Sequence, residues 1–324
     1  MVPKQNLKVI WKTLFLSLFM TITFIPVVSA DFWDISGDTM LHDPSITQEG
    51  STWWAFGTGE VDKNGVRVLR SFDGSNWHAT PVIFPQPLSW WSTYVPLHAS
   101  NQWAPDIQYY NGRYWLYYSV SSFGSNNSLI GLTSTDSIVS GNWRDDGLVI
   151  RSTTADNFNA IDGDLVIDEN GQPWLSFGSF WSGIKLTKLD PNTMKPTGQI
   201  YSIAARPNVS DHAIEAPNIT YKDGYYYLFV SFDHCCRGVD SDYKIAYGRS
   251  KNITGPYYDK NGVNMLNGGG TILDAGNERW IGPGHQDVYN NNVIVRHAYD
   301  ANNNGAPRLL INDLYWDSNG WPTY

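Results

Sequence analysis

The sequence predicts an all-β protein with a single domain, a five-bladed β-propeller. Three observations lead to this fold: a short polar motif occurs five times, an apolar residue ends every copy, and no segment after residue 30 keeps a helical period. These apolar residues, called anchors below, are Ile46, Ile107, Leu165, Ile219 and Val288, and their spacing is 61, 58, 54 and 69 residues. Sheet-forming units repeated at such a period close into a ring.

Each motif begins one blade and predicts its first strand. The copies are His42-Asp43-Pro44-Ser45-Ile46, Trp103-Ala104-Pro105-Asp106-Ile107, Ile161-Asp162-Gly163-Asp164-Leu165, Glu215-Ala216-Pro217-Asn218-Ile219 and Gly284-His285-Gln286-Asp287-Val288. A two-residue turn such as Asn111-Gly112 or Asp223-Gly224 follows, and then a run rich in aromatic residues. Asn-Gly and Asp-Gly favour the tight turn of a β-hairpin, so the second strand is expected to be antiparallel to the first.

A third strand is expected in each unit, and a short fourth strand in most of them. The third strands are predicted at 66–70, 130–133, 184–189, 245–248 and 309–316, and the fourth near Trp77, Trp143, Tyr257 and Trp321. A β-sandwich is the alternative fold. It gives no reason for a motif that returns with this period, and we therefore favour the propeller.

Residues 1–30 have the pattern of a secretory signal peptide, and residues 31–324 form the predicted catalytic propeller. Three lysines precede an apolar run that ends in Val28-Ser29-Ala30, a small-residue cleavage pattern. The run is shorter than the roughly 20 residues of a spanning helix, which disfavours a membrane anchor. We expect a secreted, extracellular protein. Four Asn-x-Ser/Thr sequons, at Asn126, Asn208, Asn218 and Asn252, agree with secretion, although Asn218 lies in a motif and is expected to be buried.

The composition limits the possible partners. The net charge is −9 and no basic run occurs, so neither nucleic acid nor an anionic membrane is an expected partner. The chain has 15 Trp and 19 Tyr residues, which pack strands or stack on sugar rings. Its two cysteines, Cys235 and Cys236, are adjacent. They cannot join distant elements, and a local disulfide and two free thiols both remain open.

Acidic residues occupy equivalent places in different copies of the motif. Asp43, Asp162 and His285 each lie three residues before their anchor, and Glu215 lies four before its own. First strands of a propeller line the central channel, so these side chains are expected to meet at one mouth of it. One protonated and one ionised carboxyl suit hydrolysis of a glycosidic bond, and a third acid can raise the donor's pKa. Asp106 lies closer to its anchor, and we interpret it as structural.

Taken together, these motifs resemble the endo-1,5-α-L-arabinanases of glycoside hydrolase family 43, over nearly the whole of residues 31–324. Further segments that carry the resemblance are Asn159-Ala160-Ile161-Asp162, Gly178-Ser179-Phe180-Trp181-Ser182-Gly183, Ile214-Glu215-Ala216-Pro217, Cys235-Cys236-Arg237-Gly238, Gly282-Pro283-Gly284-His285 and Arg296-His297-Ala298-Tyr299-Asp300. The resemblance implies an inverting glycosidase that acts on arabinan or arabino-oligosaccharides. We expect it to work as a monomer.

The resemblance also implies roles for single residues. Asp43 is the implied general base, Glu215 the general acid, and Asp162 the residue that tunes the pKa of Glu215 and orients it. Inversion requires about 6.5 to 9.5 Å between acid and base. Many relatives have proline where this chain has Gly163, and a second acid, Asp164, follows; the offset from the anchor favours Asp162 for the tuning role.

Sugar contacts and a metal ion follow from the same resemblance. The implied substrate-binding residues are Gly124, Asn159, Ser179, Phe180 and Trp181, with Trp103 and Phe123 as further stacking candidates. His285 resembles a histidine beside a hydrated Ca²⁺ ion in the central channel. Calcium favours oxygen ligands, so waters would complete its shell. A hydrogen-bonded histidine without a metal is the alternative.

Three other functions compete with an endo-arabinanase. An exo-acting α-L-arabinofuranosidase or β-xylosidase of the same family shares the three acids, but no long insertion or appended sandwich is evident here to close the cleft. Fructan-cleaving propellers have an Arg-Asp-Pro triplet, which is absent from this sequence. A non-catalytic carbohydrate-binding propeller would have no need of all three acids. We therefore predict an endo-acting hydrolase.

Overall fold

The structure is a computed structural model in which Met1 and residues 32–324 are described. Apart from Met1, the predicted signal peptide at residues 1–30 lies outside the described residues. No helix in the described part of the chain combines the length and the apolar character that a membrane crossing needs.

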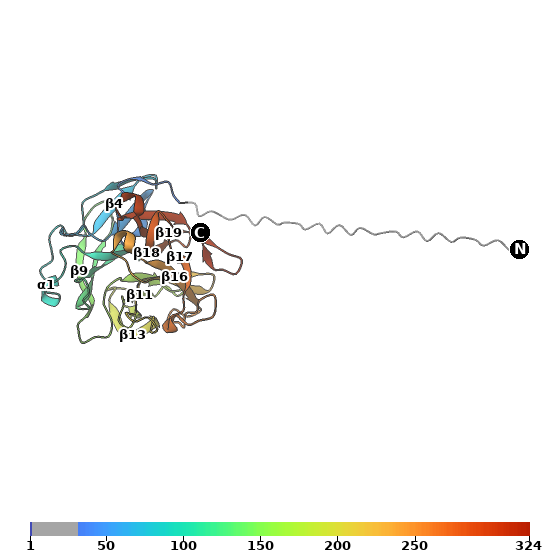
Figure 1. Cartoon of the computed structure of the whole chain (residues 1–324). Helices are drawn as coiled ribbons and strands as arrows, with labels where there is room; N and C mark the ends of the chain where they lie inside the picture. The colour runs from blue at the N-terminus through green and yellow to red at the C-terminus, as the bar shows by residue number, and fades with distance from the viewer. Residues whose placement is uncertain (2–31) are drawn as a thin grey trace.

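Five β-sheets surround a central axis (Figure 1). Each inner strand contacts the inner strand of the next sheet, and the last one contacts the first, so the ring is closed. This arrangement confirms the predicted five-bladed propeller. The inner strands are β2 (Ser45–Glu49), β6 (Trp103–Tyr110), β10 (Asp164–Ile167), β14 (Ile214–Lys222) and β18 (Trp280–Tyr289).

The second and third strands of every blade are antiparallel to their neighbours, as predicted. The second strands are β3 (Thr52–Gly57), β7 (Arg113–Val120), β11 (Pro173–Phe177), β15 (Tyr225–Phe232) and β19 (Val293–Asp300). The third strands are β4 (Arg67–Ser71), β8 (Ser128–Thr135), β12 (Ile184–Leu189), β16 (Lys244–Ser250) and β20 (Ala306–Asp313). Asn111-Gly112 and Asp223-Gly224 have positive φ at both positions, as a type I′ hairpin turn requires.

Fourth strands occur in four blades of the described chain. They are β5 (Asn76–Ala79), β9 (Arg144–Ser152), β13 (Pro196–Ala204) and β17 (Thr271–Asp274), and β1 (Ser36–Gly37) adds to β5 in parallel. The predictions near Trp77 and Trp143 are confirmed. The prediction near Tyr257 is wrong, because Tyr257 is a buried loop residue and its neighbour Tyr258 makes only isolated bridges.

The fifth blade is completed by the N-terminal end of the described chain. Phe32 forms an antiparallel bridge with Asn312, and the Trp33 N–H donates to the Ile311 carbonyl at 2.9 Å. This segment occupies the place predicted for a fourth strand near Trp321, which is wrong. Residues there form instead a small hairpin of β21 (Tyr315–Trp316) and β22 (Pro322–Thr323). The first and last blades therefore lie side by side (Figure 1).

The anchors of the five motifs belong to the apolar core between blades. All are buried, with exposed fractions between 0% and 5%. The helical segments are single turns in loops: α1 (Trp91–Tyr94), η1 (Gly238–Asp240), η2 (Met265–Asn267) and η3 (Ala301–Asn303). Of the sequon asparagines, Asn126 and Asn218 are buried, the latter as predicted, whereas Asn208 and Asn252 are exposed.

Candidate active site

The residue three before the anchor has a left-handed backbone in all five blades. These residues are Asp43, Ala104, Asp162, Ala216 and His285, with φ between 46° and 59°. A non-glycine residue in this region costs of order 1–3 kcal/mol, and such strain gathers at functional sites. The shared conformation places equivalent positions at one mouth of the channel. It also shows that Ala216, one residue after Glu215, is the true equivalent of Asp43.

Asp43 is a buried carboxylate with several polar neighbours. Its Oδ2 accepts a hydrogen bond from the Thr58 hydroxyl at 2.5 Å and lies 2.7 Å from Nδ1 of His42. Its Oδ1 lies 3.3 Å from Nδ1 of His285 and 3.5 Å from Nδ1 of His297. Burial raises the pKa of Asp43, but the imidazoles of His42, His285 and His297 outweigh burial and hold it well below its ordinary value. Asp43 is therefore ionised.

Glu215 lies at the start of β14 and accepts hydrogen bonds from two hydroxyls. The Ser179 Oγ donates to Oε2 and the Tyr243 hydroxyl donates to Oε1, both at 2.7 Å. Burial raises the pKa of Glu215; the two hydroxyls oppose this shift, and the charge of Asp43 adds to it. The net pKa is raised, so Glu215 keeps a proton at higher pH than an ordinary glutamate.

Asp162 joins the third blade to the peptide beside Glu215. The Ala216 N–H donates to Asp162 Oδ2 at 3.1 Å, and the Asp162 N–H donates to the Ser119 hydroxyl at 3.0 Å. Burial raises the pKa of Asp162 well above its ordinary value, and the negative charges of Glu215 and then Asp43 add to the shift. Asp162 is thus placed to influence both the charge and the position of Glu215.

The site therefore contains an ionised carboxylate and a carboxyl with raised pKa, supplied by different blades. Environments that push two pKa values apart are how a protein assigns the roles of base and acid. This arrangement can activate a water molecule at Asp43 and deliver a proton from Glu215 to a leaving oxygen.

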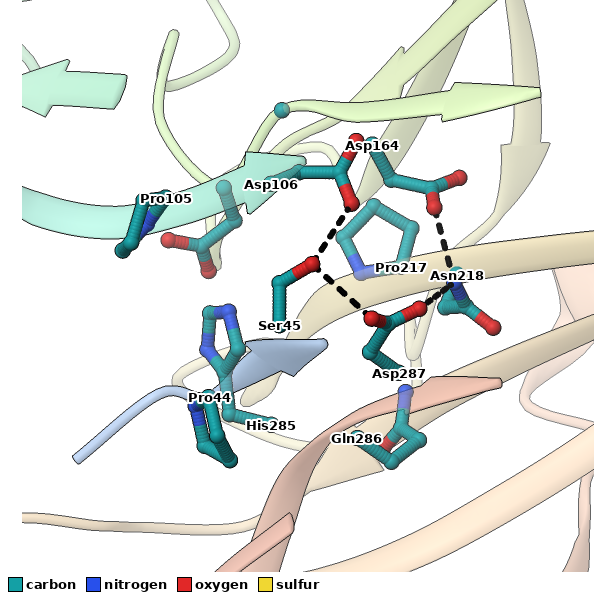
Figure 2. Close-up of a pocket in the computed structure, with 12 residues that line it drawn as sticks. Pro44, Ser45, Pro105, Asp106, Asp164, Pro217, Asn218, His285, Gln286 and Asp287 are labelled. Atoms are coloured by element: carbon teal, nitrogen blue, oxygen red, sulfur yellow. Dashed lines mark hydrogen bonds between the residues drawn. The ribbon is translucent and has the colours of Figure 1, made fainter. Parts of the chain in front are cut away.

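Asp164 belongs to a second set of residues, deeper in the channel. The residues one before each anchor are Ser45, Asp106, Asp164, Asn218 and Asp287, and we call them the channel ring (Figure 2). Four of these side chains accept hydrogen bonds from anchor N–H groups of neighbouring blades: Ile46 donates to Asp287, Ile107 to Ser45, Leu165 to Asp106 and Ile219 to Asp164, at 2.8 to 3.1 Å. The Asn218 amide bridges Asp164 and Asp287. The channel ring joins the blades, which agrees with a structural role for Asp106.

The sequence did not reveal the channel ring, although every member lies at one fixed offset from its anchor. The residue type varies between Asp, Asn and Ser, so the pattern is visible only once the shared acceptor role is known. Burial raises the pKa of Asp164 to about 7 and that of Asp287 to about 6. In Asp106, burial and then the charges of these two acids raise the pKa well above its ordinary value.

Exchanging Asp162 and Asp164 separately for asparagine should separate the two sets. We expect Asp162→Asn to lower kcat by about 100-fold or more, since the change affects the proton donor. Asp164→Asn should lower the free energy of unfolding by about 1–3 kcal/mol through the channel ring, with turnover within about threefold of the native protein. Initial rates and thermal melts of both variants measure this. Near-native turnover in Asp162→Asn with collapse in Asp164→Asn would reverse the assignment.

The residues predicted to touch sugar lie in loops that follow second strands or precede β10. Asn159 is buried and its Oδ1 has no hydrogen-bond partner in the described structure, so it is available to a ligand hydroxyl. Phe180 and Trp181 have φ of 53° and 43°, an uncommon conformation for bulky residues, and are partly exposed. Ser179 binds Glu215, and Gly124 lies in an exposed turn with open space around its Cα.

His285 lies between the catalytic mouth and the channel ring. Its backbone N–H donates to the Ser231 hydroxyl at 2.9 Å. Its side chain and the channel ring line the same small pocket (Figure 2). The pocket presents carboxylate, amide and hydroxyl oxygens, and Asn218 Oδ1 is buried without a hydrogen-bond partner among the described residues. Oxygen donors of this kind fit a hard cation such as Ca²⁺.

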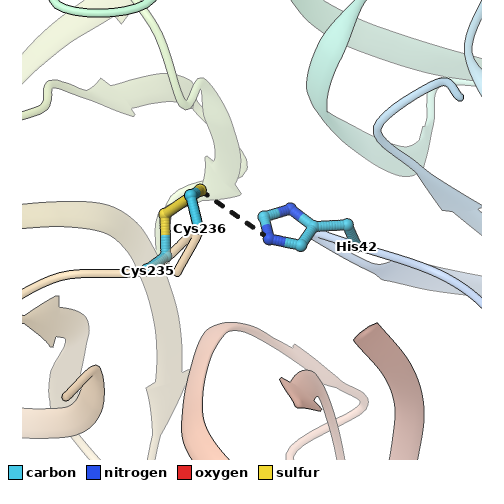
Figure 3. Close-up of side chains that lie close together, drawn as sticks. All are labelled: His42, Cys235 and Cys236. Atoms are coloured by element: carbon cyan, nitrogen blue, oxygen red, sulfur yellow. Dashed lines mark hydrogen bonds between the residues drawn. A yellow bond between two sulfur atoms is a disulfide. The ribbon is translucent and has the colours of Figure 1, made fainter. Parts of the chain in front are cut away.

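Several polar neighbours of the acids had no role in the sequence prediction. His42, Tyr243, His297 and Tyr299 all lie within the site, and the His42 and His297 rings stack with centroids 3.8 Å apart. The adjacent cysteines form a disulfide, one of the two states left open, with Cys236 beside His42 (Figure 3).

Comparisons with known proteins agree with this geometry. The family model described as "Glycosyl hydrolases family 43" matches residues 37–322. An extracellular endo-α-(1→5)-L-arabinanase of Bacillus subtilis is 66% identical over 295 residues, which cover 91% of this chain and 90% of that protein. An extracellular exo-α-(1→5)-L-arabinofuranosidase of Cellvibrio japonicus is 42% identical, covering 87% and 85%.

A solved structure shows the same fold. The endo-arabinanase of Bacillus licheniformis is 74% identical and superimposes with a TM-score of 0.89, over 90% of this chain and all of that chain. The family match spans all three predicted acids and every blade of the ring. The chain belongs to glycosyl hydrolases family 43.

Proposed function

We propose that this protein is a secreted glycosidase that cleaves internal α-1,5-L-arabinofuranosidic bonds of arabinan with inversion. The observation that carries the proposal is the pairing of Asp43, held ionised among imidazoles, with Glu215, whose pKa is raised by burial. The three acids come from three blades and lie at one mouth of the channel. A binding protein without catalysis gives no reason for this opposed pair.

The names of the relatives support arabinan as substrate and endo action. Two relatives named as endo-arabinanases are 66% and 74% identical to this chain, whereas one named as exo-acting is 42% identical. The first of these is also named as extracellular, which supports secretion of this chain by the predicted signal peptide.

The proposed reaction gives each of the three acids one role. Asp43 removes a proton from a water molecule as this water attacks the anomeric carbon. Glu215 donates its proton to the departing glycosidic oxygen, and the bond between this oxygen and the anomeric carbon breaks. The new Glu215 carboxylate is stabilised by the hydroxyls of Ser179 and Tyr243. Asp162 holds the peptide beside Glu215, and the charge repulsion between these two acids favours the protonated form of Glu215 before the reaction.

The products from linear debranched arabinan test this function. Endo cleavage should release short oligosaccharides with an early fall in viscosity, and NMR should show the β-anomer at each new reducing end first. Arabinose alone from the outset would mean exo action. Retained binding without any release would mean a carbohydrate-binding protein, and an initial α-anomer would overturn inversion.

Phe123 is expected to stack on the substrate. It lies in the loop after β7, at the catalytic mouth, and its side chain is 85% exposed. We expect Phe123→Ala to raise KM for arabinan about three- to tenfold with little change in kcat, since an aromatic contact contributes about 0.5–1.5 kcal/mol. Phe72→Ala removes a similarly exposed ring at the opposite end of a blade and should leave KM unchanged. Equal KM values for both variants would exclude the contact.

A hydrated calcium ion beside His285 and the channel ring is the second part of the proposal. It would supply positive charge among buried carboxylates and stabilise the ring. We expect chelation to lower Tm by about 5 °C, which corresponds to loss of a ligand present at about 100 times its Kd. Ca²⁺, unlike Mg²⁺, should restore Tm. An unchanged Tm in a protein shown by elemental analysis to contain no calcium would exclude the ion.

A further inference from the structure

His42 connects the proposed base to the disulfide loop. Its Nδ1 lies 2.7 Å from Asp43 Oδ2, and its Nε2 lies 2.8 Å from the Tyr299 hydroxyl. The Tyr299 hydroxyl in turn lies 2.7 Å from the backbone nitrogen of Cys236. A single row of polar groups therefore runs from a loop at the rim of the site to the carboxylate that activates water.

The direction of each hydrogen bond in this row is fixed by its ends. A backbone N–H can only donate, so the Tyr299 oxygen accepts from Cys236, and the Tyr299 proton is available for His42 Nε2. The ionised Asp43 carboxylate at the other end can only accept, so a neutral His42 has its proton on Nδ1, 2.7 Å from Asp43 Oδ2. A protonated His42 has a proton on Nδ1 as well. In both charge states the Nδ1–H donates to Asp43 Oδ2.

This donor leaves the two oxygens of Asp43 unequal. Oδ2 accepts from the Thr58 hydroxyl, and His42, with Nδ1 2.7 Å away, also hydrogen-bonds this carboxylate. Oδ1 accepts no hydrogen bond from the described residues, and the nearest imidazole nitrogens are 3.3 and 3.5 Å away. The nearer belongs to His285. The farther, Nδ1 of His297, already accepts the Asp43 N–H at 3.1 Å and so cannot donate when neutral.

The His42 ring is also held in place from outside the row. It stacks on His297 at 3.8 Å between centroids, with 23° between the planes. On its Nε2 side, Sγ of Cys236 approaches to 3.9 Å (Figure 3). The disulfide to Cys235 constrains the residue whose N–H begins the row. Imidazole rotation would break the bond to Asp43, and these contacts oppose it.

We propose that His42, backed by Tyr299 and the Cys236 N–H, is the positioning residue of the base: it holds Asp43 Oδ2 and leaves Oδ1 to take the proton from water. This inference rests on the proposed function for the role of Asp43. The direction of the hydrogen bonds stands without it.

Two substitutions of His42 test whether the site needs a hydrogen-bond donor at the place of Nδ1 or only a polar side chain at position 42. The amide nitrogen of asparagine lies close to the place of Nδ1, whereas that of glutamine lies close to Nε2. We expect His42→Gln to lower kcat on debranched arabinan about 100-fold with KM within about threefold, because misplacement of a reacting group by about 1 Å has this effect. The kcat of His42→Asn should be at least tenfold higher than that of His42→Gln. Equal losses in both variants, or a loss confined to KM, would overturn the inference.

Tyr299→Phe tests the other end of the row. We expect kcat to fall about tenfold without a change in KM. Tyr114→Phe is the matched control: it also removes a hydrogen-bonding hydroxyl, which here donates to the carbonyl of Gln48, but it lies at the far end of a blade and should keep native kcat. Equal kcat values in the two tyrosine variants would count against the row.

A spectroscopic measurement separates this inference from the proposed function. ¹⁵N NMR of the histidine-labelled native protein, with His42 assigned by its absence in His42→Asn, reports which ring nitrogen is protonated. Protonated Nδ1, with or without protonated Nε2, supports the inference even if the native protein fails to cleave arabinan. A neutral ring protonated on Nε2 alone would overturn it, even if arabinan is cleaved.

Discussion

Replacing Glu215 with glutamine is expected to lower kcat on arabinan by about 10²- to 10⁴-fold, the usual contribution of a general acid. Glutamine keeps the size of the side chain and can still bond the hydroxyls of Ser179 and Tyr243, but it has no acidic proton for the leaving oxygen. A general acid with a raised pKa works only while it is protonated, so native activity should fall as the pH rises through the pKa of Glu215. Glu215→Gln should lack this alkaline limb of the pH profile.

The leaving group provides the decisive comparison for Glu215. A 4-nitrophenyl glycoside of an arabino-oligosaccharide departs as a weakly basic anion that hardly needs a proton. We therefore expect Glu215→Gln to cleave it at a rate close to the native rate. Glu169→Gln, at an exposed turn, should leave both substrates unaffected. An equal loss on both substrates would show that Glu215 is not the proton donor.

The architecture of the site followed from the repeat because its signals are local. An apolar anchor and a two-residue turn specify each hairpin, and counting from the anchor placed Asp43, Asp162 and His285 in equivalent positions. The structure gives these three the same backbone conformation, with φ of 51°, 59° and 50°. The strand pairing that completes the fifth blade was less predictable. The outer edge of the fifth blade is supplied by Phe32 and Trp33, about 280 residues away in sequence, and no local pattern encodes that pairing.

The partners of the acids could not be derived from spacing. Tyr243 reaches Glu215 from the fourth blade, and Tyr299 reaches His42 from the fifth. Tyrosine is frequent throughout this chain, so neither residue stands out as a candidate. Three-dimensional proximity alone distinguishes them from the tyrosines that pack between strands.

Counting residues back from the anchor identified Asp43, but it did not show which residue of the fourth blade is the structural equivalent of Asp43. Glu215 lies four residues before its anchor, and in the structure Ala216 takes the left-handed position in that blade. The general acid therefore approaches the site from a different backbone position than the base. A difference of this kind gives the two carboxyls different surroundings, which the opposed pKa shifts require.

Replacing Asp43 with alanine should reduce kcat by a similar factor, about 10²- to 10⁴-fold, but leave the proton donor intact. Glu215 can then still protonate the leaving oxygen, including on a poor leaving group, and only the attack by water is impaired. The fold should persist, since the blades are joined by the channel ring. Thermal melts check this. Asp136→Ala, which removes an exposed carboxylate paired only with Arg113, is the control and should keep native turnover.

Azide distinguishes loss of the base from general damage to the site. This anion attacks carbon without giving up a proton, so it needs no base, and the methyl group of alanine leaves space for it beside the anomeric carbon. We expect azide to restore turnover in Asp43→Ala and to yield the β-L-arabinofuranosyl azide, with inversion at the reacting carbon. Azide should not restore Glu215→Gln on arabinan, because there the missing group is the acid. An α-azide from Asp43→Ala would imply attack on a covalent intermediate and would overturn the inverting mechanism. No restoration, with native-like folding, would assign the base to another residue.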